Sequence, residues 1–374
     1  MFLKAETGSQ QTVSRKAGRQ EREMYAAVTY GTDDIRFETC DTPVPGPGEV
    51  RVKVKFSGIC GSDVPRVNKG AAHMYPMIFG HEFSGVVDAV GEGVTARSVG
   101  DRVVGVPLVP CLDCPDCARG DYALCTRYSF IGSRRQGSFA EYIVLPQKNV
   151  FPLDPGISFE KGALFEPATI GLHALFHTDF RGGKDAVVIG CGTVGLFTIQ
   201  WLRIMGARRI AAVNRSREKL KLAGKMGASD LISTLDEDYM EQLAALTGGR
   251  GFDYVFDASG SEEMMQQDFL LGANKAKICM IGTPARDMTF PPRIWKKINW
   301  REMSVTGTWM SYSAPFPGPE WEMTSACLKN GSLVCDDAVI DRVLPLKDAA
   351  DAFALYKIPG EIKGRVLLNC EITG

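Results

Sequence analysis

Two patterns of apolar and polar positions follow each other along the chain. Apolar and polar residues alternate strictly over 50–56, as in a strand with one buried face, and 83–90 and 102–106 are further short apolar runs. Turn-forming residues are dense over 43–48 and 91–93. The chain up to about residue 150 is therefore predicted to form a β-rich, barrel-like domain.

From residue 165 onward, apolar strands alternate with helical stretches. The predicted helices are 168–177, 194–205 and 218–226, and the predicted strands are 186–190, 210–213, 254–257 and 276–281. This alternation predicts a parallel, doubly wound sheet, so the fold class is α/β. We expect the tail from 309, with a helix near 321–330 and a strand over 365–368, to rejoin the N-terminal β domain.

Composition excludes several classes of partner. Lys and Arg number 43 against 44 Asp and Glu, which leaves no global field for nucleic acid or an anionic membrane. No apolar run of about 18 residues appears, and the polar segment 1–23 lacks the apolar core of a signal peptide. We expect a soluble, cytoplasmic protein with a polar extension over 1–23, to which no function is assigned.

A glycine motif follows the predicted strand at 186–190. Gly190, Gly192 and Gly195 form Gly-x-Gly-x-x-Gly at the start of an apolar helix that contains Thr193 and Val194. These glycines permit a tight turn, a close approach of pyrophosphate and close packing of helix on strand. The segment predicts a dinucleotide site; the alternative is a glycine turn without a ligand.

The residue that should contact the adenosine ribose is not acidic. Asn214 stands where a carboxylate would bind the ribose hydroxyls, and Arg215 and Lys219 lie close by. A missing carboxylate and nearby cations favour NADP over NAD. The alternative is that these cations belong to a solvated helix start.

Four of the eleven cysteines lie on one short segment: Cys111, Cys114, Cys117 and Cys125. Four thiolates close a tetrahedral shell, so we predict a structural Zn²⁺ here; disulfides or chance clustering are the alternatives. A second, scattered set is Cys60, His81, Glu82 and Glu166. One Cys, one His and one carboxylate would leave Zn²⁺ an open position for catalysis, although each of these residues also has an ordinary structural explanation.

Together these motifs resemble the zinc-containing medium-chain dehydrogenase/reductase family, in which they occur in the same order along the chain. The resemblance covers roughly residue 24 to the end. It implies a GroES-like catalytic domain over 24–175 and 309–374, a Rossmann domain over 176–308, and a dimer or tetramer. Glu166 within Phe-Glu-Pro is similar to the sorbitol dehydrogenase branch, which points to a polyol substrate. Glu166 is favoured as the third catalytic ligand, with Glu82 as the alternative.

Within that branch, longer strings at 63–66, 75–85, 130–135 and 307–313 look most like the galactitol-1-phosphate 5-dehydrogenases. Their implied reaction converts galactitol 1-phosphate and NAD⁺ to tagatose 6-phosphate and NADH, although Asn214 departs from their pattern. Ser62 corresponds to the hydroxyl of the family's proton relay. The candidate substrate residues are Arg66, Arg134 and Arg135 for a phosphate, and Trp309 and Tyr312 for the cleft. The alternative functions are a dehydrogenase of unphosphorylated polyols or secondary alcohols, and a noncatalytic NADP-binding redox sensor.

Overall fold

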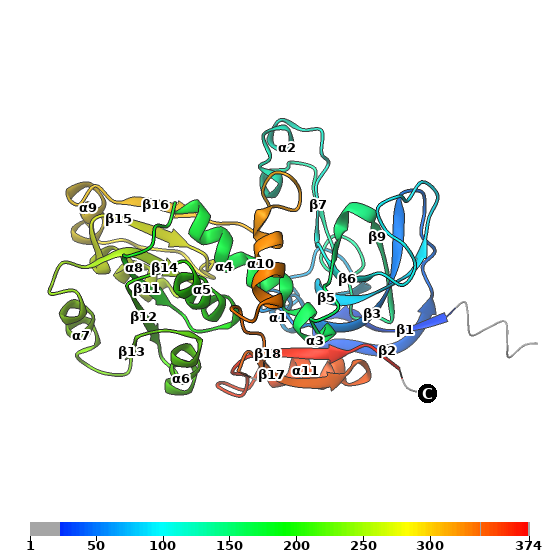
Figure 1. Ribbon diagram of the computed structural model, residues 1–374. Coiled ribbons are helices and arrows are strands. Elements are labelled where there is room, and N and C mark those ends of the chain that lie inside the picture. The colour runs from blue at the N-terminus through cyan, green and yellow to red at the C-terminus, as the bar shows by residue number, and fades with distance from the viewer. Residues whose placement is uncertain (1–22, 337, 373–374) are drawn as a thin grey trace, which may run out of the picture.

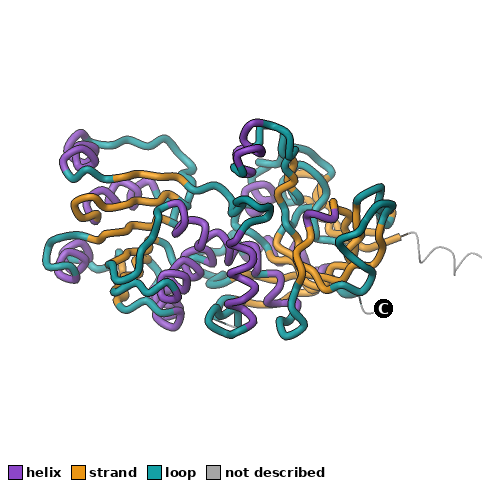
Figure 2. Tube along the Cα trace, turned by 45° about the horizontal axis from the view of Figure 1, so that its top comes forward, coloured by secondary structure: helices purple, strands orange, loops and turns teal. Residues whose placement is uncertain are grey.

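The computed structural model describes residues 23–336 and 338–372, so the predicted extension lies outside the described residues except for Glu23. The strands gather in two groups (Figure 2). One group, with helices α5 to α9, forms one half of the molecule (Figure 1). The other group forms the opposite half, and helices α4 and α10 lie between them (Figure 1).

The half without α5 to α9 is rich in β-strands, as the alternation over 50–56 predicts, and its strands pair mainly antiparallel, although β17 pairs with β18 in parallel. Within the described residues, a three-stranded sheet has the order β2-β1-β4, and a seven-stranded sheet has the order β10-β6-β5-β3-β18-β17, with β9 also paired to β3. A separate ribbon pairs β7 with β8. The strand bounds are β1 Glu23–Gly31, β2 Asp34–Asp41, β3 Glu49–Gly58, β4 Met77–Ile78, β5 Glu82–Val90, β6 Arg102–Gly105, β7 Leu108–Val109, β8 Ser129–Phe130, β9 Tyr142–Pro146, β10 Val150–Pro152, β17 Ile340–Pro345 and β18 Arg365–Asn369.

The other half of the described chain contains a six-stranded parallel sheet of order β13-β12-β11-β14-β15-β16. From β11 the chain first adds β12 and β13 on one side and then β14, β15 and β16 on the other. This reversal of direction at β11 is typical of a doubly wound nucleotide-binding sheet. The strand bounds are β11 Asp185–Ile189, β12 Arg209–Asn214, β13 Asp230–Ser233, β14 Phe252–Asp257, β15 Gly272–Met280 and β16 Ser304–Gly307. The helix bounds are α5 Thr193–Ile204, α6 Arg217–Met226, α7 Tyr239–Leu246, α8 Glu262–Leu271 and α9 Pro292–Trp300.

Helix α4 (Phe165–His177) joins the two halves. It packs against α5, where the indole Nε1 of Trp201 donates to the carbonyl of Ala168 at 2.7 Å. After the parallel sheet, the chain returns to the half that contains β3, because β18 pairs antiparallel with β3. The remaining helices are α1 Asp63–Asn68, α2 Pro115–Arg119, α3 Phe159–Ala163, α10 Pro319–Lys329 and α11 Ala349–Leu355.

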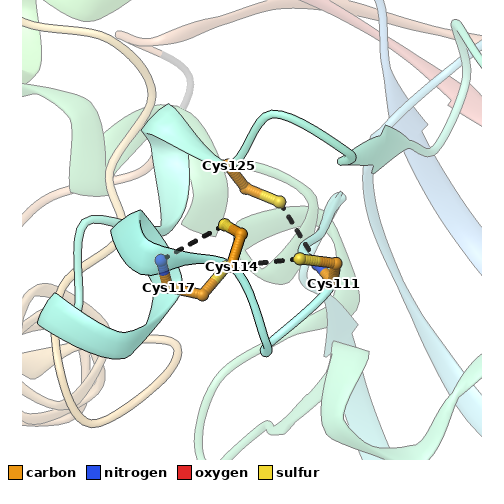
Figure 3. A group of neighbouring side chains, drawn as sticks. All are labelled: Cys111, Cys114, Cys117 and Cys125. Atoms are coloured by element: carbon orange, nitrogen blue, oxygen red, sulfur yellow. Dashed lines mark hydrogen bonds between the residues drawn. The ribbon is translucent and has the colours of Figure 1, made fainter.

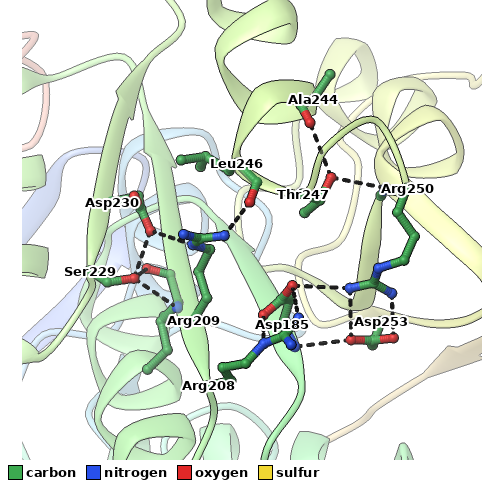
Figure 4. Close-up of polar contacts among 12 residues, drawn as sticks. Asp185, Arg208, Arg209, Ser229, Asp230, Ala244, Leu246, Thr247, Arg250 and Asp253 are labelled. Atoms are coloured by element: carbon green, nitrogen blue, oxygen red, sulfur yellow. Dashed lines mark hydrogen bonds and ion pairs between the residues drawn. The ribbon is translucent and has the colours of Figure 1, made fainter.

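A polar network holds the amino-terminal end of the parallel sheet. The carboxylate of Asp185, the first residue of β11, accepts two hydrogen bonds from Arg208 at 2.8 and 2.6 Å and one from Arg250 at 3.0 Å (Figure 4). Arg250 also pairs with Asp253 of β14, whose carboxylate accepts the N–H of Asp185. The two central strands are thus tied together at the end opposite the glycine turn.

Among the described residues, no helix has the length and apolar character that crossing a membrane requires.

Candidate metal and cofactor sites

The pairing of β3 with β5 brings three of the scattered ligand candidates together. Gly58, at the end of β3, lies opposite Glu82 at the start of β5. Cys60 comes two residues after β3 and His81 comes directly before β5, so both lie at this end of the strand pair. One ligand atom from each of Cys60, His81 and Glu82 lies within 4.8 Å of the others. A thiolate, an imidazole and a carboxylate at such distances match the donor set of zinc.

Two residues that the sequence did not single out surround this cluster. Asp63 Oδ1 lies 3.6 Å from Nδ1 of His81, and Arg365 Nε lies 3.0 Å from Oε2 of Glu82. The position of Asp63, three residues after Cys60, could have indicated from the sequence that it lies beside the site. Arg365 carried none, because only the return of β18 beside β3 brings it here.

The electrostatics of the cluster fit a bound cation. Burial opposes ionisation of the Cys60 thiol, yet the neighbouring His81 lowers the pKa of that thiol to about 6. Burial raises the pKa of Glu82 to about 8, against the opposing charge of Arg365. Nδ1 of His81 and both carboxylate oxygens of Glu82 are buried and have no hydrogen-bond partner among the described residues. A metal ion would give such groups the partner that they lack.

Glu166 lies near these residues but outside the group whose atoms are mutually within 4.8 Å. It stands in the first turn of α4 and is 7% exposed. Burial raises the pKa of Glu166 to about 7, and the charges of His81 and Glu82 act on it as well. Besides Asp63, the structure thus supplies two buried carboxyl groups, Glu82 and Glu166, near Cys60 and His81.

The residues after Cys60 form the edge of this site. Ser62 is exposed, its N–H points to Sγ of Cys60 at 3.5 Å, and its hydroxyl accepts a hydrogen bond from Arg66 at 3.1 Å. Arg66 also donates to Asp63 at 3.0 Å. A hydroxyl and a guanidinium therefore stand together beside the candidate catalytic cysteine.

The other two candidate arginines differ in their placement. Arg134 is exposed, lies over the ring of Tyr128 at 4.5 Å, and follows Phe130, whose ring contacts His81 edge-on at 5.3 Å. Arg135 instead pairs with Glu49 at 3.4 Å and lines a separate hollow of about 420 Å³. Because Glu49 begins β3 whereas Gly58 beside Glu82 ends it, the Arg135 side chain points away from the candidate metal site. This placement argues against its predicted contact with substrate.

The two aromatic candidates for the cleft also separate. Trp309 is 54% exposed and follows the carboxyl end of β16, so its side chain is accessible. Tyr312 is only 2% exposed, and its ring stacks between Phe316 and Trp321 at 5.8 and 6.1 Å. Tyr312 is therefore part of the hydrophobic core and does not line an open cleft, because aromatic packing covers it.

The four clustered cysteines converge around α2 (Figure 3). Their sulfur atoms all lie within 4.8 Å of one another, and Cys111 Sγ lies 3.9 Å from Cys117 Sγ, too far for a disulfide. The N–H of Cys117 lowers the pKa of the Cys114 thiol to about 6. Four close thiol groups, one of them acidified, suit a closed tetrahedral zinc site.

The glycine motif has the backbone that its sequence predicts. Gly190 has φ +92°, and a Cβ there would lie 2.9 Å from Ser259 Cα; a Cβ on Gly195 would lie 1.8 Å from the carbonyl oxygen of Gly190. Gly192 is the N-cap of α5 and has open space where its Cβ would be. The first-turn residues Thr193 and Val194 follow it, so helix N–H groups face the open space.

Beside this turn lies a hollow of about 490 Å³, lined by residues from the carboxyl ends of several strands. Gly190, Asn214, Arg215 and Ser259 are among them. The Asn214 side chain accepts the N–H of Cys191 at 3.1 Å and donates to the carbonyl of Ser216 at 3.3 Å. Arg215 is exposed, whereas Lys219 is half-buried and does not line the hollow. Ser259 and Ser261 were not predicted, because only the fold brings them beside the glycines.

Comparison with known proteins places the chain among zinc-type dehydrogenases. Residues 46–155 match the model of the alcohol dehydrogenase GroES-like domain, and residues 193–326 match that of the zinc-binding dehydrogenase domain. The chain is 40% identical over 294 residues to galactitol 1-phosphate 5-dehydrogenase of Escherichia coli strain K12, covering 79% of this chain and 85% of the relative.

Two further proteins extend this similarity. The chain is 34% identical over 269 residues to sorbitol dehydrogenase of Bacillus subtilis strain 168, covering 71% of this chain and 76% of that one. The crystal structure of galactitol-1-phosphate dehydrogenase from Escherichia coli superimposes with a TM-score of 0.89 at 37% identity, covering 92% of this chain and all (100%) of that chain.

Proposed function

Because the chain belongs to the zinc-containing medium-chain dehydrogenase/reductase family, we propose that it oxidises a sugar-alcohol phosphate, galactitol 1-phosphate, to tagatose 6-phosphate. The observation that carries this proposal is the cluster of Cys60, His81 and Glu82 at the edge formed by Ser62 and Arg66. The cluster supports dehydrogenase chemistry, and the adjacent arginine supports a phosphorylated substrate.

Cys60 and His81 would hold a catalytic zinc with Glu166 as the favoured third ligand. Glu82, which lies closer to Cys60 and His81 and pairs with Arg365, is the alternative third ligand. Zinc bound there would supply Lewis-acid chemistry that lowers the pKa of a coordinated hydroxyl group. Ser62, whose exposed hydroxyl neighbours Cys60, would accept the hydroxyl proton and pass it to solvent. Cys111, Cys114, Cys117 and Cys125 would hold a second, structural zinc.

The substrate phosphate would bind the guanidinium of Arg66, with Arg134 as a second cation. Arg66 is already oriented by Ser62 and Asp63, and its side chain keeps 20% exposure. Trp309 would cover the apolar side of the cleft. Arg135 and Tyr312 have no place in this arrangement, since the first faces another hollow and the second is buried.

The cofactor would be NADP, bound across the glycine turn. Asn214 leaves the ribose without a repelling carboxylate, and Arg215 is exposed beside it, free to pair with a 2′-phosphate. Lys219 lies farther in: burial lowers its pKa, against the opposing influence of Cys191 and Asp341.

The remaining expectations concern organisation in the cell. We propose a catalytic domain over 24–175 and 309–374 and a Rossmann domain over 176–308 in a cytoplasmic homodimer or homotetramer. The parallel sheet ends in β16, where Val305 is 43% exposed, and Trp300 nearby is 69% exposed. An open strand edge with exposed apolar side chains supports pairing with a second copy of the chain.

The proposal is tested by measuring kcat/KM for galactitol 1-phosphate and for galactitol on zinc-replete protein, with NAD⁺ and NADP⁺ in turn. We expect the phosphorylated substrate to win by about a hundredfold, roughly 2.7 kcal/mol of transition-state binding. Arg66→Gln should remove most of that ratio, whereas Arg135→Gln, the matched control, should leave it unchanged. Equal values for both substrates would instead indicate an unphosphorylated polyol, and no turnover of any alcohol would indicate a noncatalytic redox sensor.

A further inference from the structure

Two buried carboxyl groups lie beneath the cofactor hollow, and the proposed reaction uses neither. Asp257 ends β14 and Asp268 lies in the second half of α8. Both residues are 0% exposed. Their carboxyl groups lie within hydrogen-bonding reach of each other, and one can donate to the other only when it carries a proton.

Asp257 organises the loop that follows β14. Its Oδ1 accepts the N–H of Ser259 at 2.7 Å, the hydroxyl of the same serine at 2.8 Å, and the N–H of Gly260 at 3.2 Å. This loop packs directly on the glycine turn, because a Cβ on Gly190 would lie 2.9 Å from Ser259 Cα. Ser259 and Ser261 also line the 490 Å³ hollow. The position of Asp257 therefore sets one wall of the cofactor site.

The other carboxyl oxygens of this pair have no donor. Asp257 Oδ2 and both oxygens of Asp268 are buried and receive no hydrogen bond from any described residue. Buried carboxylate oxygens without a donor destabilise the folded state, and two adjacent buried carboxyl groups cannot both be ionised. One proton between them gives Asp257 Oδ2 and one oxygen of Asp268 a partner.

Among the described residues, no cation donates a hydrogen bond to either carboxyl group. Burial and the neighbouring Asp257 raise the pKa of Asp268 well above its usual range, and burial raises the pKa of Asp257 against the donors Ser259 and Gly260. Several other charged side chains lie on α8 and on the elements packed around it. They are Glu262 and Glu263 on α8, Asp253 on β14, Lys275 and Lys277 on β15, and Arg293, Lys296 and Lys297 on α9.

We propose that Asp257 and Asp268 share one proton and act as positioning residues for the cofactor site. The shared proton fixes α8 to the end of β14 and so holds the Ser259 loop against Gly190. Deprotonation breaks this bond. The folded pair binds its proton more tightly than the unfolded chain does, so its contribution to stability is present at low pH and is lost as pH rises through the folded pKa.

The first test compares wild type with Asp268→Asn, which keeps a hydrogen-bond donor but cannot titrate. The melting temperature is measured between about pH 5 and pH 9 at constant ionic strength. As pH rises, wild type should lose stability relative to Asp268→Asn, while Glu262→Gln, a change of a half-buried acid on the same helix, should follow wild type. Parallel curves for wild type and Asp268→Asn would overturn the proposal.

The second test measures the Kd of NADP⁺ by calorimetry. Asp268→Asn should bind like wild type, whereas Asp268→Ala should raise the Kd about fivefold or more, within the range known for residues that act through a neighbour. An unchanged Kd in Asp268→Ala overturns the positioning role. Failure of wild type to bind either dinucleotide would instead refute the cofactor assignment, and the melting curves would still test the shared proton.

A third measurement needs no folded variant at position 268. The infrared spectrum of wild type should contain the C=O band of a buried protonated carboxyl group at neutral pH. This band should shift in Asp257→Asn, because the proton on Asp268 loses its carboxylate acceptor. A spectrum in which Asp257→Asn leaves every such band unchanged would overturn the shared proton.

Discussion

Replacing Asn214 by Asp should reverse the cofactor preference. Asn214 ends β12 and lines the cofactor hollow beside the exposed Arg215. An Asp side chain would still accept the N–H of Cys191, so the glycine turn keeps its support. It would lose the hydrogen bond to the Ser216 carbonyl and would add a negative charge beside the site of a 2′-phosphate.

The size of this effect follows from Coulomb's law. Charges about 6 Å apart at an effective dielectric constant between about 20 and 80 repel by about 1 to 3 kcal/mol. This repulsion lowers kcat/KM for NADP⁺ by roughly 5- to 150-fold. NAD⁺ should lose little or gain, because the new carboxylate can accept hydrogen bonds from both ribose hydroxyls.

The assay is the ratio of kcat/KM for NADP⁺ to that for NAD⁺ with one alcohol substrate at saturation. Arg217→Gln is the control. Arg217 begins α6, close in sequence to Asn214 and Arg215, but its side chain pairs with Asp236 at 2.6 Å. The reasoning is refuted if Asn214→Asp changes the ratio by less than about threefold, or if the control changes it as much.

Three further predictions concern the metal sites and stability. Cys114→Ser should remove the structural zinc and lower the melting temperature, as seen by metal analysis and calorimetry; an unaltered zinc content would contradict the four-thiolate site. Glu166→Gln should lower kcat by about 100-fold or more and release the catalytic zinc, whereas retention of zinc here and its loss in Glu82→Gln would assign the ligand to Glu82. Asp185→Asn should cost about 1 to 3 kcal/mol in urea unfolding at pH 7. Arg208 lowers the pKa of Asp185 in the folded state, so this deficit should shrink as pH falls through that pKa, and a deficit independent of pH would contradict it.

Much of the fold was predictable where the apolar pattern is strong. The predicted strand 186–190 corresponds to β11 and the helix 194–205 to α5, each within one residue at either end. Strand β16 was not predicted, because its four residues, Ser304–Gly307, are mostly exposed and show no apolar alternation. Helices α7, α8 and α9 were not predicted either.

The candidate site was predictable only in part. The four cysteines are close in sequence, so their spacing alone indicated a metal site. Cys60, His81 and Glu82 meet through the register of β3 and β5, and periodicity cannot reveal that register. Arg365 reaches the site only because β18 pairs with β3, and the Asp257–Asp268 pair depends on how α8 packs against β14. Tyr312 was predicted to line the cleft, but it packs in an aromatic cluster, and the sequence alone does not distinguish these two environments for a tyrosine.

The central claim, that one zinc site serves the reaction and another serves the fold, is tested most directly by measuring zinc content and dehydrogenase activity in wild type and in Cys60→Ser. We predict two zinc ions per chain in wild type, and in Cys60→Ser the loss of one ion and of activity while the melting temperature stays close to that of wild type. Cys40→Ser, which changes a half-buried cysteine outside both clusters, should retain both ions and full activity. A single zinc ion in wild type, or a Cys60→Ser protein that keeps both its metal and its activity, would contradict the account.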